Sequence, residues 1–470
     1  MSLLAPSLPA GAAEAEAIPA GQRNLPIDLP TALRLANAQN LQVALAREQI
    51  RQALARVEAA QVLWLPSIRG GLNYNRHDGA IQAVDGTQFN TSRAAFDAGL
   101  GAGIYGAGTP MIPGIYANFH LTDALFQPLA ARQFAGARNR AAMAATNDAL
   151  LEVSLAYLEL LRAHEDLAIS QGIHARVQTL TEITAHYART GQGLQADADR
   201  LQTELMLRKN DVLRGEEACQ VASARLAQLL HLDPTIFLEP IEPTIVPLDL
   251  TPPEIPLTEL VAQGLSRRPE LAESRLLVAE AVTRLRRERL APLLPSVLLG
   301  TSYGAMSAGI NTNMAPGAGR LDADAVAYWE LRNLGLGDQA ARDGASSMVR
   351  QAQVRQLAVM DQISREVTEA SAQSQARRRQ IGIAREGVQA AVESHQRNLD
   401  RIEAAKGLPI EALQSVQALA NAQREYLRSL VDYDAAQFAL YRALGWPVRL
   451  DLPAANPPSP AQPRSSRKAA

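Results

Sequence analysis

The feature that most constrains this chain is an internal repeat that spans most of its 470 residues. Residues 29–78 return, with many substitutions, as residues 257–306. The shared landmarks are Leu65-Pro66-Ser67 with Leu294-Pro295-Ser296, Leu129-Ala130-Ala131-Arg132 with Gln339-Ala340-Ala341-Arg342, and Gly193-Leu194 with Gly407-Leu408. Solenoid repeats are only about 20–50 residues long, so a repeat of this length indicates a duplicated structural unit.

Each copy predicts the same order of elements: a helix, an extended stretch and a very long helical hairpin. The first copy predicts one helix over residues 29–65, with Thr31 as its cap. A helix of roughly 60 residues, on the order of 90 Å long, then runs from Gln127 to about Thr190. The remaining hairpin helices are predicted at 195–230, 339–406 and 410–444. A heptad seam of the first hairpin includes Leu150, Val153, Tyr157, Leu160, His164 and Leu167.

Four short segments alternate apolar with polar residues at a period of two, which is typical of strands with two unlike faces. They lie near residues 67–76, 113–122, 296–305 and 324–333. The apolar positions that we expect to face lipid or its interface are Leu72, Tyr74, Phe119, Leu299, Tyr303 and Trp329. The fold class is therefore mainly α with a β-barrel portion.

Neither part of this fold is complete in one chain. A helix this long is too narrow to bury its own apolar seam, so it requires neighbouring helices. Four strands cannot close a barrel, and an open sheet cannot sit in lipid. Three copies would supply twelve strands and enough hairpins for a closed helical cylinder, so we expect a trimer.

Composition excludes several function classes. The net charge of −2 and the lack of aromatic residues among the basic runs argue against nucleic-acid binding. The single cysteine and seven scattered histidines give no metal-ligand spacing, so we expect no metal site and no cofactor. Residues 101–106 match a dinucleotide-binding string, but no strand–helix unit surrounds them, and we interpret them as loop or barrel glycines. We find no catalytic constellation and expect no enzyme.

The repeated Leu-Pro-Ser junctions, the segment 328–335 and the hairpin tips at Gly191 and Gly407 together resemble the TolC-type outer-membrane factors. This resemblance covers about residues 25–450. It implies a homotrimer in the outer membrane of a Gram-negative bacterium, with a twelve-stranded barrel and a helical periplasmic tunnel. The tips would meet a periplasmic adaptor that links them to an inner-membrane pump. The function implied is a passive exit duct for small molecules or ions.

The resemblance also divides the chain. Repeats are expected at 25–245 and 246–450, between a flexible segment (1–24) and a disordered tail (451–470), with equatorial parts near 25–40, 231–260 and 440–452. The Gly-rich stretch 77–113 is about 20 residues longer than its counterpart, so we expect an enlarged extracellular loop or an extension of the barrel rim. Two alternatives remain: a type I protein-secretion duct with the same fold, and a soluble coiled-coil scaffold, which would not need the strands.

Charged and apolar residues gather at the predicted tips. Gate or selectivity candidates are Asp400, Glu403, Arg397, Arg401, Arg189 and Asp197, because threefold symmetry would turn each charge into a ring. Candidates for contact with the adaptor are Gly191, Gly193, Leu194, Gly407 and Leu408. We expect the three glycines to take positive φ, which a tight helix reversal often needs. The plain alternative is ordinary surface charge near a loop.

Overall fold

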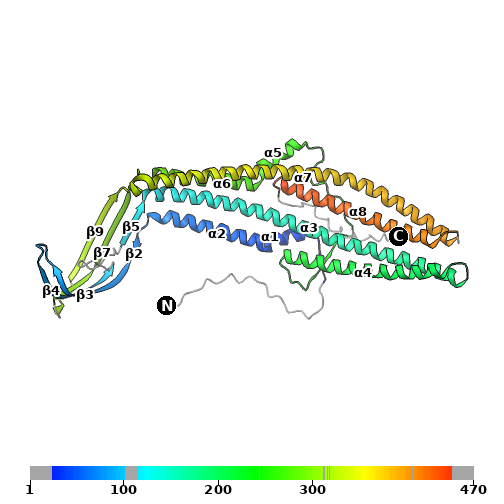
Figure 1. The fold of residues 1–470 in the computed structure, drawn as a ribbon, viewed down its shortest axis with the longest axis horizontal. Coiled ribbons are helices and arrows are strands. Elements are labelled where there is room, and N and C mark those ends of the chain that lie inside the picture. The colour runs from blue at the N-terminus through cyan, green and yellow to red at the C-terminus, as the bar shows by residue number, and fades with distance from the viewer. Residues whose placement is uncertain are drawn as a thin grey trace, which may run out of the picture.

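The computed structural model describes residues 24–100, 115–242, 244–310, 313–314, 316, 318–404 and 406–446. The predicted tail at 451–470 lies outside these residues, as do the predicted N-terminal segment except for Asn24 and the string at 101–106. Figure 1 shows a long rod of helices with a small sheet at one end. Among the described residues, no helix has the length and apolar character needed to cross a bilayer.

The helices follow the same order in both halves of the chain. The first half contains α1 (Leu29–Gln39), α2 (Leu41–Gln61), α3 (Leu121–Arg189) and α4 (Gln195–Leu229). The second half contains α5 (Leu257–Arg267), α6 (Pro269–Leu290), α7 (Leu336–Glu403) and α8 (Pro409–Ala443). Their lengths are 11, 21, 69 and 35 residues in the first half and 11, 22, 68 and 35 in the second.

The prediction of one helix over residues 29–65 is wrong, because the helix breaks at Asn40. Its backbone is extended there, with ψ 128°, and its side chain accepts a hydrogen bond from the backbone N of Gln42 at 2.9 Å. The predicted cap is also displaced, since the carboxylate of Asp28 accepts from the backbone N of Thr31 at 2.8 Å. Asp28 therefore caps α1 and Asn40 caps α2.

The helices form one layer in which each helix mainly contacts its neighbours. Near the sheet, α2 contacts α3, α3 contacts α6, and α6 contacts α7. Toward the tips, α4 contacts α3, α3 contacts α8, and α8 contacts α7. Figure 1 shows α3 and α7 running along most of the rod, with α6 and α8 following one another between them. The two outer helices of the layer therefore keep one side free at every level.

The strands form a small parallel pair and a larger antiparallel sheet. The parallel pair joins β1 (Asn24–Ile27) to β6 (Phe237–Pro240). The larger sheet contains β2 (Ser67–Ile68), β3 (Gly70–Gln82), β4 (Gln88–Leu100), β5 (Ile115–His120), β7 (Ser296–Ile310), β8 (Asn313–Met314) and β9 (Ala318–Tyr328). β2 with β3 and β4 with β5 each lie along one line, so the lines run in the order β2/β3, β4/β5, β7 and β9.

The sheet is larger than the four predicted strands. β3 runs to Gln82, six residues beyond the predicted end at 76; β4 lies in the stretch 77–113, for which the sequence predicts no strand; and β9 begins at Ala318 rather than near 324. β7 continues five residues beyond the predicted end at 305, to Ile310. The last strand ends at Tyr328 rather than near 333, because Asn333 and Leu334 take positive φ of 50° and 59° in a short turn before α7. The backbone N of Arg332 also donates to the Asp338 carboxylate at 3.0 Å, which fixes this turn.

Some of the extra residues of the first copy extend the sheet, because β3 and β4 stay paired from Asp78–Ser92 to Gln82–Gln88, past the point where β7 ends opposite Arg93. β3 pairs with β4 along its whole length, and only residues 83–87 connect the two strands. The register jumps elsewhere: Leu100 lies opposite Tyr303, whereas Ile115 lies opposite Thr301. Residues 101–114, which separate these two positions in the sequence, lie outside the described part of the chain.

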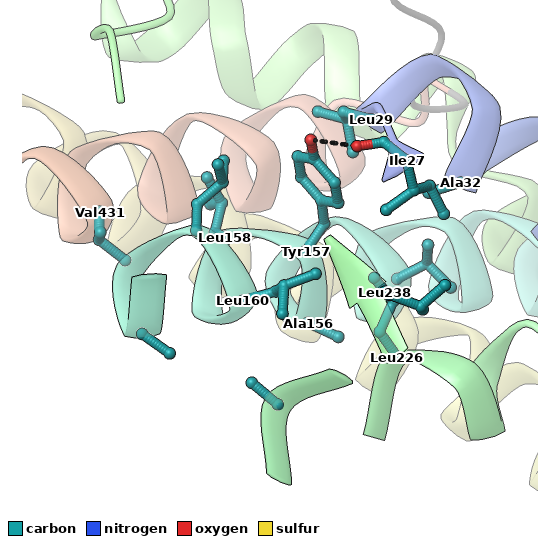
Figure 2. Packing of buried hydrophobic residues seen from close by; sticks show 14 of the residues in the cluster. Ile27, Leu29, Ala32, Ala156, Tyr157, Leu158, Leu160, Leu226, Leu238 and Val431 are labelled. Carbon is teal, nitrogen blue, oxygen red and sulfur yellow. Dashed lines mark hydrogen bonds between the residues drawn. The ribbon is translucent and has the colours of Figure 1, made fainter. Parts of the chain in front are cut away.

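The largest core lies where the linker between the halves crosses the rod. It packs α1, α3, α4 and α8 around the β1–β6 pair. Figure 2 shows Tyr157 pointing toward Ile27, and the tyrosine hydroxyl donates to the Ile27 carbonyl at 3.2 Å. Leu150, Val153, Tyr157 and Leu160 of the predicted heptad seam are all buried. The core thus ties the linker and the N-terminal strand into a belt around the helices.

Candidate functional site

The two hairpin tips are built alike. In the first tip, the backbone N of Gly193 donates to the carbonyl of Tyr187 at 3.0 Å. In the second, the backbone N of Gly407 donates to the carbonyl of Arg401 at 2.9 Å. Each acceptor lies six residues before its glycine, and each following leucine is extended, with ψ 135° at Leu194 and 136° at Leu408. The repeated sequence therefore folds into the same turn twice.

The expectation of positive φ at three tip glycines is right only for Gly191, whose φ is 78°. Gly193 and Gly407 are needed for another reason, which is close approach of the chain. A Cβ on Gly193 would lie 3.2 Å from the Cβ of Tyr187, and a Cβ on Gly407 would lie 3.1 Å from the backbone N of Ile402. These distances are tighter than ordinary packing allows, so a side chain there would push the turn open.

Each tip exposes one large apolar side chain next to its glycine. Leu194 is 68% exposed and Leu408 is 59% exposed. Asp197 follows in the first turn of α4 and is half-buried. Figure 1 places both tips at the end of the rod opposite the sheet. The tips thus present a mixed apolar and charged surface at one extreme of the molecule.

The candidate gate cations pair within their own hairpin. Arg397 forms an ion pair with Glu393 at 2.8 Å, one turn earlier on α7. Arg401 pairs with Glu411 at the start of α8, at 3.2 Å. In the single chain these arginines join the two helices of the second hairpin or reinforce one of them. Their role as gate residues in a trimer stays a prediction.

The other gate candidates are also held locally or point to solvent. The carboxylate of Asp400 accepts from Gln396 Nε2 at 2.9 Å. Arg189 Nε donates to the Ala185 carbonyl at 3.3 Å on its own helix. Glu403 is exposed in the last turn of α7, close to the tip. Asp400 and Glu403 therefore leave carboxylate oxygens available near the end of the rod.

Contacts between the two hairpins were not predicted from the sequence. The hydroxyl of Tyr187 lies 3.3 Å from the carbonyl oxygens of both Ile402 and Glu403. Further from the tips, Arg424 of α8 pairs with Asp166 of α3 at 2.8 Å. Asp166 and Arg424 are 258 residues apart, so no local pattern marks them as partners. These contacts hold the second hairpin against the first within one chain.

The sheet has one apolar face. Residues opposite one another in a register share a face, and the ladder puts Leu72 opposite Ala98, and Tyr303 opposite Leu321. The predicted apolar positions on this face are exposed, at 73% for Leu72, 58% for Tyr74, 44% for Leu299 and 63% for Tyr303. Asn73 and Asn75 lie on the other face and are less exposed than Leu72 and Tyr74.

The remaining two predicted positions lie at the end of the sheet next to the helices. Phe119, on β5, is half-buried because its ring packs against Trp64, with 5.4 Å between the ring centroids. Trp329 follows β9 directly and is 64% exposed, so it lies beyond the strand rather than within it. Aromatic side chains thus mark the level at which strands change to helices.

Comparison with solved structures identifies this architecture. A membrane protein from Pseudomonas aeruginosa matches with a TM-score of 0.73 at 19% identity, over 89% of this chain and 93% of that one. The CmeC outer-membrane channel of Campylobacter jejuni matches with a TM-score of 0.73 at 15% identity, over 89% and 85%. The open MtrE outer-membrane channel of Neisseria gonorrhoeae gives 0.67 at 17%, over 90% and 89%. The chain has the fold of these outer-membrane channels.

The sequence itself gives no such match. No protein-family model matches the chain, and no curated protein is similar enough in sequence to report. The likeness therefore lies in the arrangement of helices and strands.

Proposed function

We propose that this chain is one subunit of a homotrimeric outer-membrane duct that forms the exit channel of a tripartite efflux system. The observation that carries the proposal is the open sheet with an exposed apolar face, attached to a single layer of long helices. An open sheet leaves backbone groups unpaired at its edges, which lipid does not tolerate. Three copies supply twelve strand lines, enough to close a barrel and remove those edges.

The mechanism we propose is passive conduction from the periplasm to the exterior. The apolar face of the sheet would meet lipid, and the face that carries Asn73 and Asn75 would line the pore. The matched outer-membrane channels support this arrangement. Energy would come from an inner-membrane pump through a periplasmic adaptor, so the chain itself needs no catalytic site. A soluble scaffold would have no use for the exposed apolar sheet.

The adaptor would dock on the hairpin tips. Leu194 and Leu408 are exposed beside rigid glycine turns, and both occupy the same place in their turns. An apolar side chain that is fixed and solvent-exposed is typical of a contact surface rather than of a free loop. Six such leucines would surround the end of a trimer.

The gate would lie at the same end. Asp400 and Glu403 are three residues apart, so one face of α7 carries both. Three chains would bring six carboxylates near one constriction. Their combined negative potential would attract cations and repel anions there. Replacing both residues by alanine should weaken cation selectivity and reduce block by divalent cations in planar-bilayer recordings. Unchanged selectivity and block would exclude this gate assignment and leave the duct standing.

The central experiment measures assembly and conduction on the same preparation. Sedimentation in detergent should give the mass of three chains, and reconstituted protein should form ion-conducting pores in planar bilayers. A folded, water-soluble monomer without pore activity would overturn the proposed function. Leu72→Arg places a charge on the apolar face and should impair insertion, whereas Asn73→Arg, the matched control on the other face, should insert normally.

A further inference from the structure

A cavity of about 770 Å³ lies near the sheet end of the helical layer. Residues of α2, α3, α6 and α7 all line it, although the main contacts among these four helices join only neighbours: α2 with α3, α3 with α6, and α6 with α7. A single hollow can be lined by both outer helices, α2 and α7, only if the layer curves around it. The cavity therefore lies on the concave face, which would face the tunnel axis when copies close into a cylinder.

Part of the cavity wall is apolar. Phe126 and Phe134 come from α3, Leu63 follows α2, and Met348 comes from α7. Met348 is 57% exposed, so its side chain is accessible to a solute in the cavity. This wall suits a flat apolar group such as an aromatic ring. The volume lies within the range of about 300–1,000 Å³ that is usual for small-molecule sites.

The polar part of the wall presents guanidinium groups. Arg284 pairs with Glu280 at 2.6 Å, yet the arginine side chain is 61% exposed and the glutamate only 13%. Arg287 and Arg332 cover Glu288 in the same way, at 35% and 36% exposed against 13% for the carboxylate. In each pair the arginine is more exposed than its carboxylate. A solute in the cavity would therefore contact guanidinium groups more readily than carboxylates.

Arg56 adds a cation that an aromatic ring holds in place. Its guanidinium carbon lies 5.5 Å from the centroid of the Phe134 ring, and Arg138 lies 4.9 Å from the same ring. Stacking on an aromatic face orients a guanidinium and leaves its N–H donors in the plane free for a planar anion. Charge and aromatic surface thus meet at one point of the cavity wall.

We propose that this cavity is a binding vestibule for amphipathic aromatic anions. An aromatic carboxylate or sulfonate would place its ring against Phe134 and Met348 and its charge near Arg56 and Arg284. The inference deepens the proposed function, because it names the solute class that the duct favours, and its role in transport rests on that function. Binding itself can be measured without transport.

The test uses purified full-length protein in nonionic detergent and two dyes of similar shape. Fluorescein is the anionic probe and rhodamine 6G the cationic probe, and fluorescence polarisation measures the binding of each. Fluorescein should bind saturably and rhodamine 6G should bind at least tenfold more weakly. The double variant Arg56→Gln with Arg284→Gln should weaken fluorescein binding at least tenfold, and Phe134→Leu should weaken it severalfold.

The matched control is Arg51→Gln with Arg286→Gln, which removes the same charge from the same two helices, α2 and α6. Both control residues are exposed, and neither belongs to the residues that line the cavity. Equal affinity for the two dyes, or equal loss in the cavity and control variants, overturns the vestibule. Pores that conduct but bind no fluorescein refute this inference alone, whereas protein that binds fluorescein but never conducts refutes the duct.

Discussion

Asp434 offers the sharpest test of how the linker is held on the rod. The residue is buried on α8, and its carboxylate accepts a hydrogen bond from the backbone N of Leu248 at 2.8 Å. Burial raises the pKa of Asp434 from 3.8 to about 7; the hydrogen bond from Leu248 opposes this shift, and the charge of Asp249 adds to it. The linker is therefore held by a buried acid that binds its proton far more tightly than a solvent-exposed aspartate does.

The sign of the effect follows from linkage. The folded state binds the proton more tightly than the unfolded state, so stability from this group is present below pH 3.8 and is lost as pH rises through about 7. Raising the pKa of Asp434 from 3.8 to about 7 corresponds to about 4 kcal/mol in the free energy of unfolding. Asp434→Asn keeps an oxygen acceptor for the Leu248 amide and removes the charge, so it should stabilise the protein.

The measurement is guanidinium unfolding in detergent, followed by circular dichroism, at pH 5 and pH 8. We expect the gain in stability from Asp434→Asn to be larger at pH 8 than at pH 5 by about 2–3 kcal/mol. Asp432→Asn is the control, because its carboxylate is 32% exposed and pairs with Arg377 at 2.9 Å. That change should cost less than about 1 kcal/mol at either pH. A gain that does not depend on pH would refute the reasoning.

Three further changes test other surfaces. Leu72→Arg should cost about 2–4 kcal/mol of stability in lipid vesicles, whereas Asn73→Arg should be tolerated, and equal disruption by both would contradict the assigned faces. Leu194→Asp together with Leu408→Asp should leave the trimer intact in sedimentation but abolish adaptor crosslinking and export; surviving export would mean that the tips are not the docking surface. Tyr187→Phe removes the hydroxyl that contacts the end of α7, so the resting conductance of single pores should rise, and an unchanged conductance would exclude that contact from gating.

The long helices and the two faces of the sheet follow from local patterns, and the sequence alone predicts them. The heptad seam through Tyr157 must be buried because a lone helix cannot hide it. Alternation at Leu72, Asn73 and Tyr74 determines the strand phase because side chains of a strand alternate between faces. Helix reversals at Gly193 and Gly407 were predicted correctly but for the wrong reason, since the structure shows a close approach of the chain there and no positive φ.

Features that depend on distant partners were not predictable. Asn40 lies in a continuous helical pattern, and its capping of the Gln42 amide is local; the sequence does not show the contact that accompanies the break, the bond from its amide to the Leu229 carbonyl, 189 residues away. The cavity near Phe134 is missed for the same reason, since four helices from both halves form it. The pairing of Arg401 with Glu411 was likewise not foreseen, because the turn at Gly407 brings the two side chains together; the role of Arg401 between chains stays a prediction.

The two halves anchor their returning helices differently, and this difference bears on how the tips can move. Arg268, only 3% exposed, occupies the place of Asn40 and pairs with Glu270 and Glu366 at 2.6 and 2.7 Å. Removing one partner from a buried cluster leaves an uncompensated charge and is strongly destabilising. The pair of Arg424 with Asp166 is 34% and 35% exposed, and such pairs contribute only about 0.2–1 kcal/mol. The base of the second hairpin thus rests on a buried ionic cluster. Along its side the charged pair adds little, and the buried apolar contacts of Val177 with the α8 residues Leu413 and Val416 carry the packing, so any separation of the two hairpins has to expose that apolar surface.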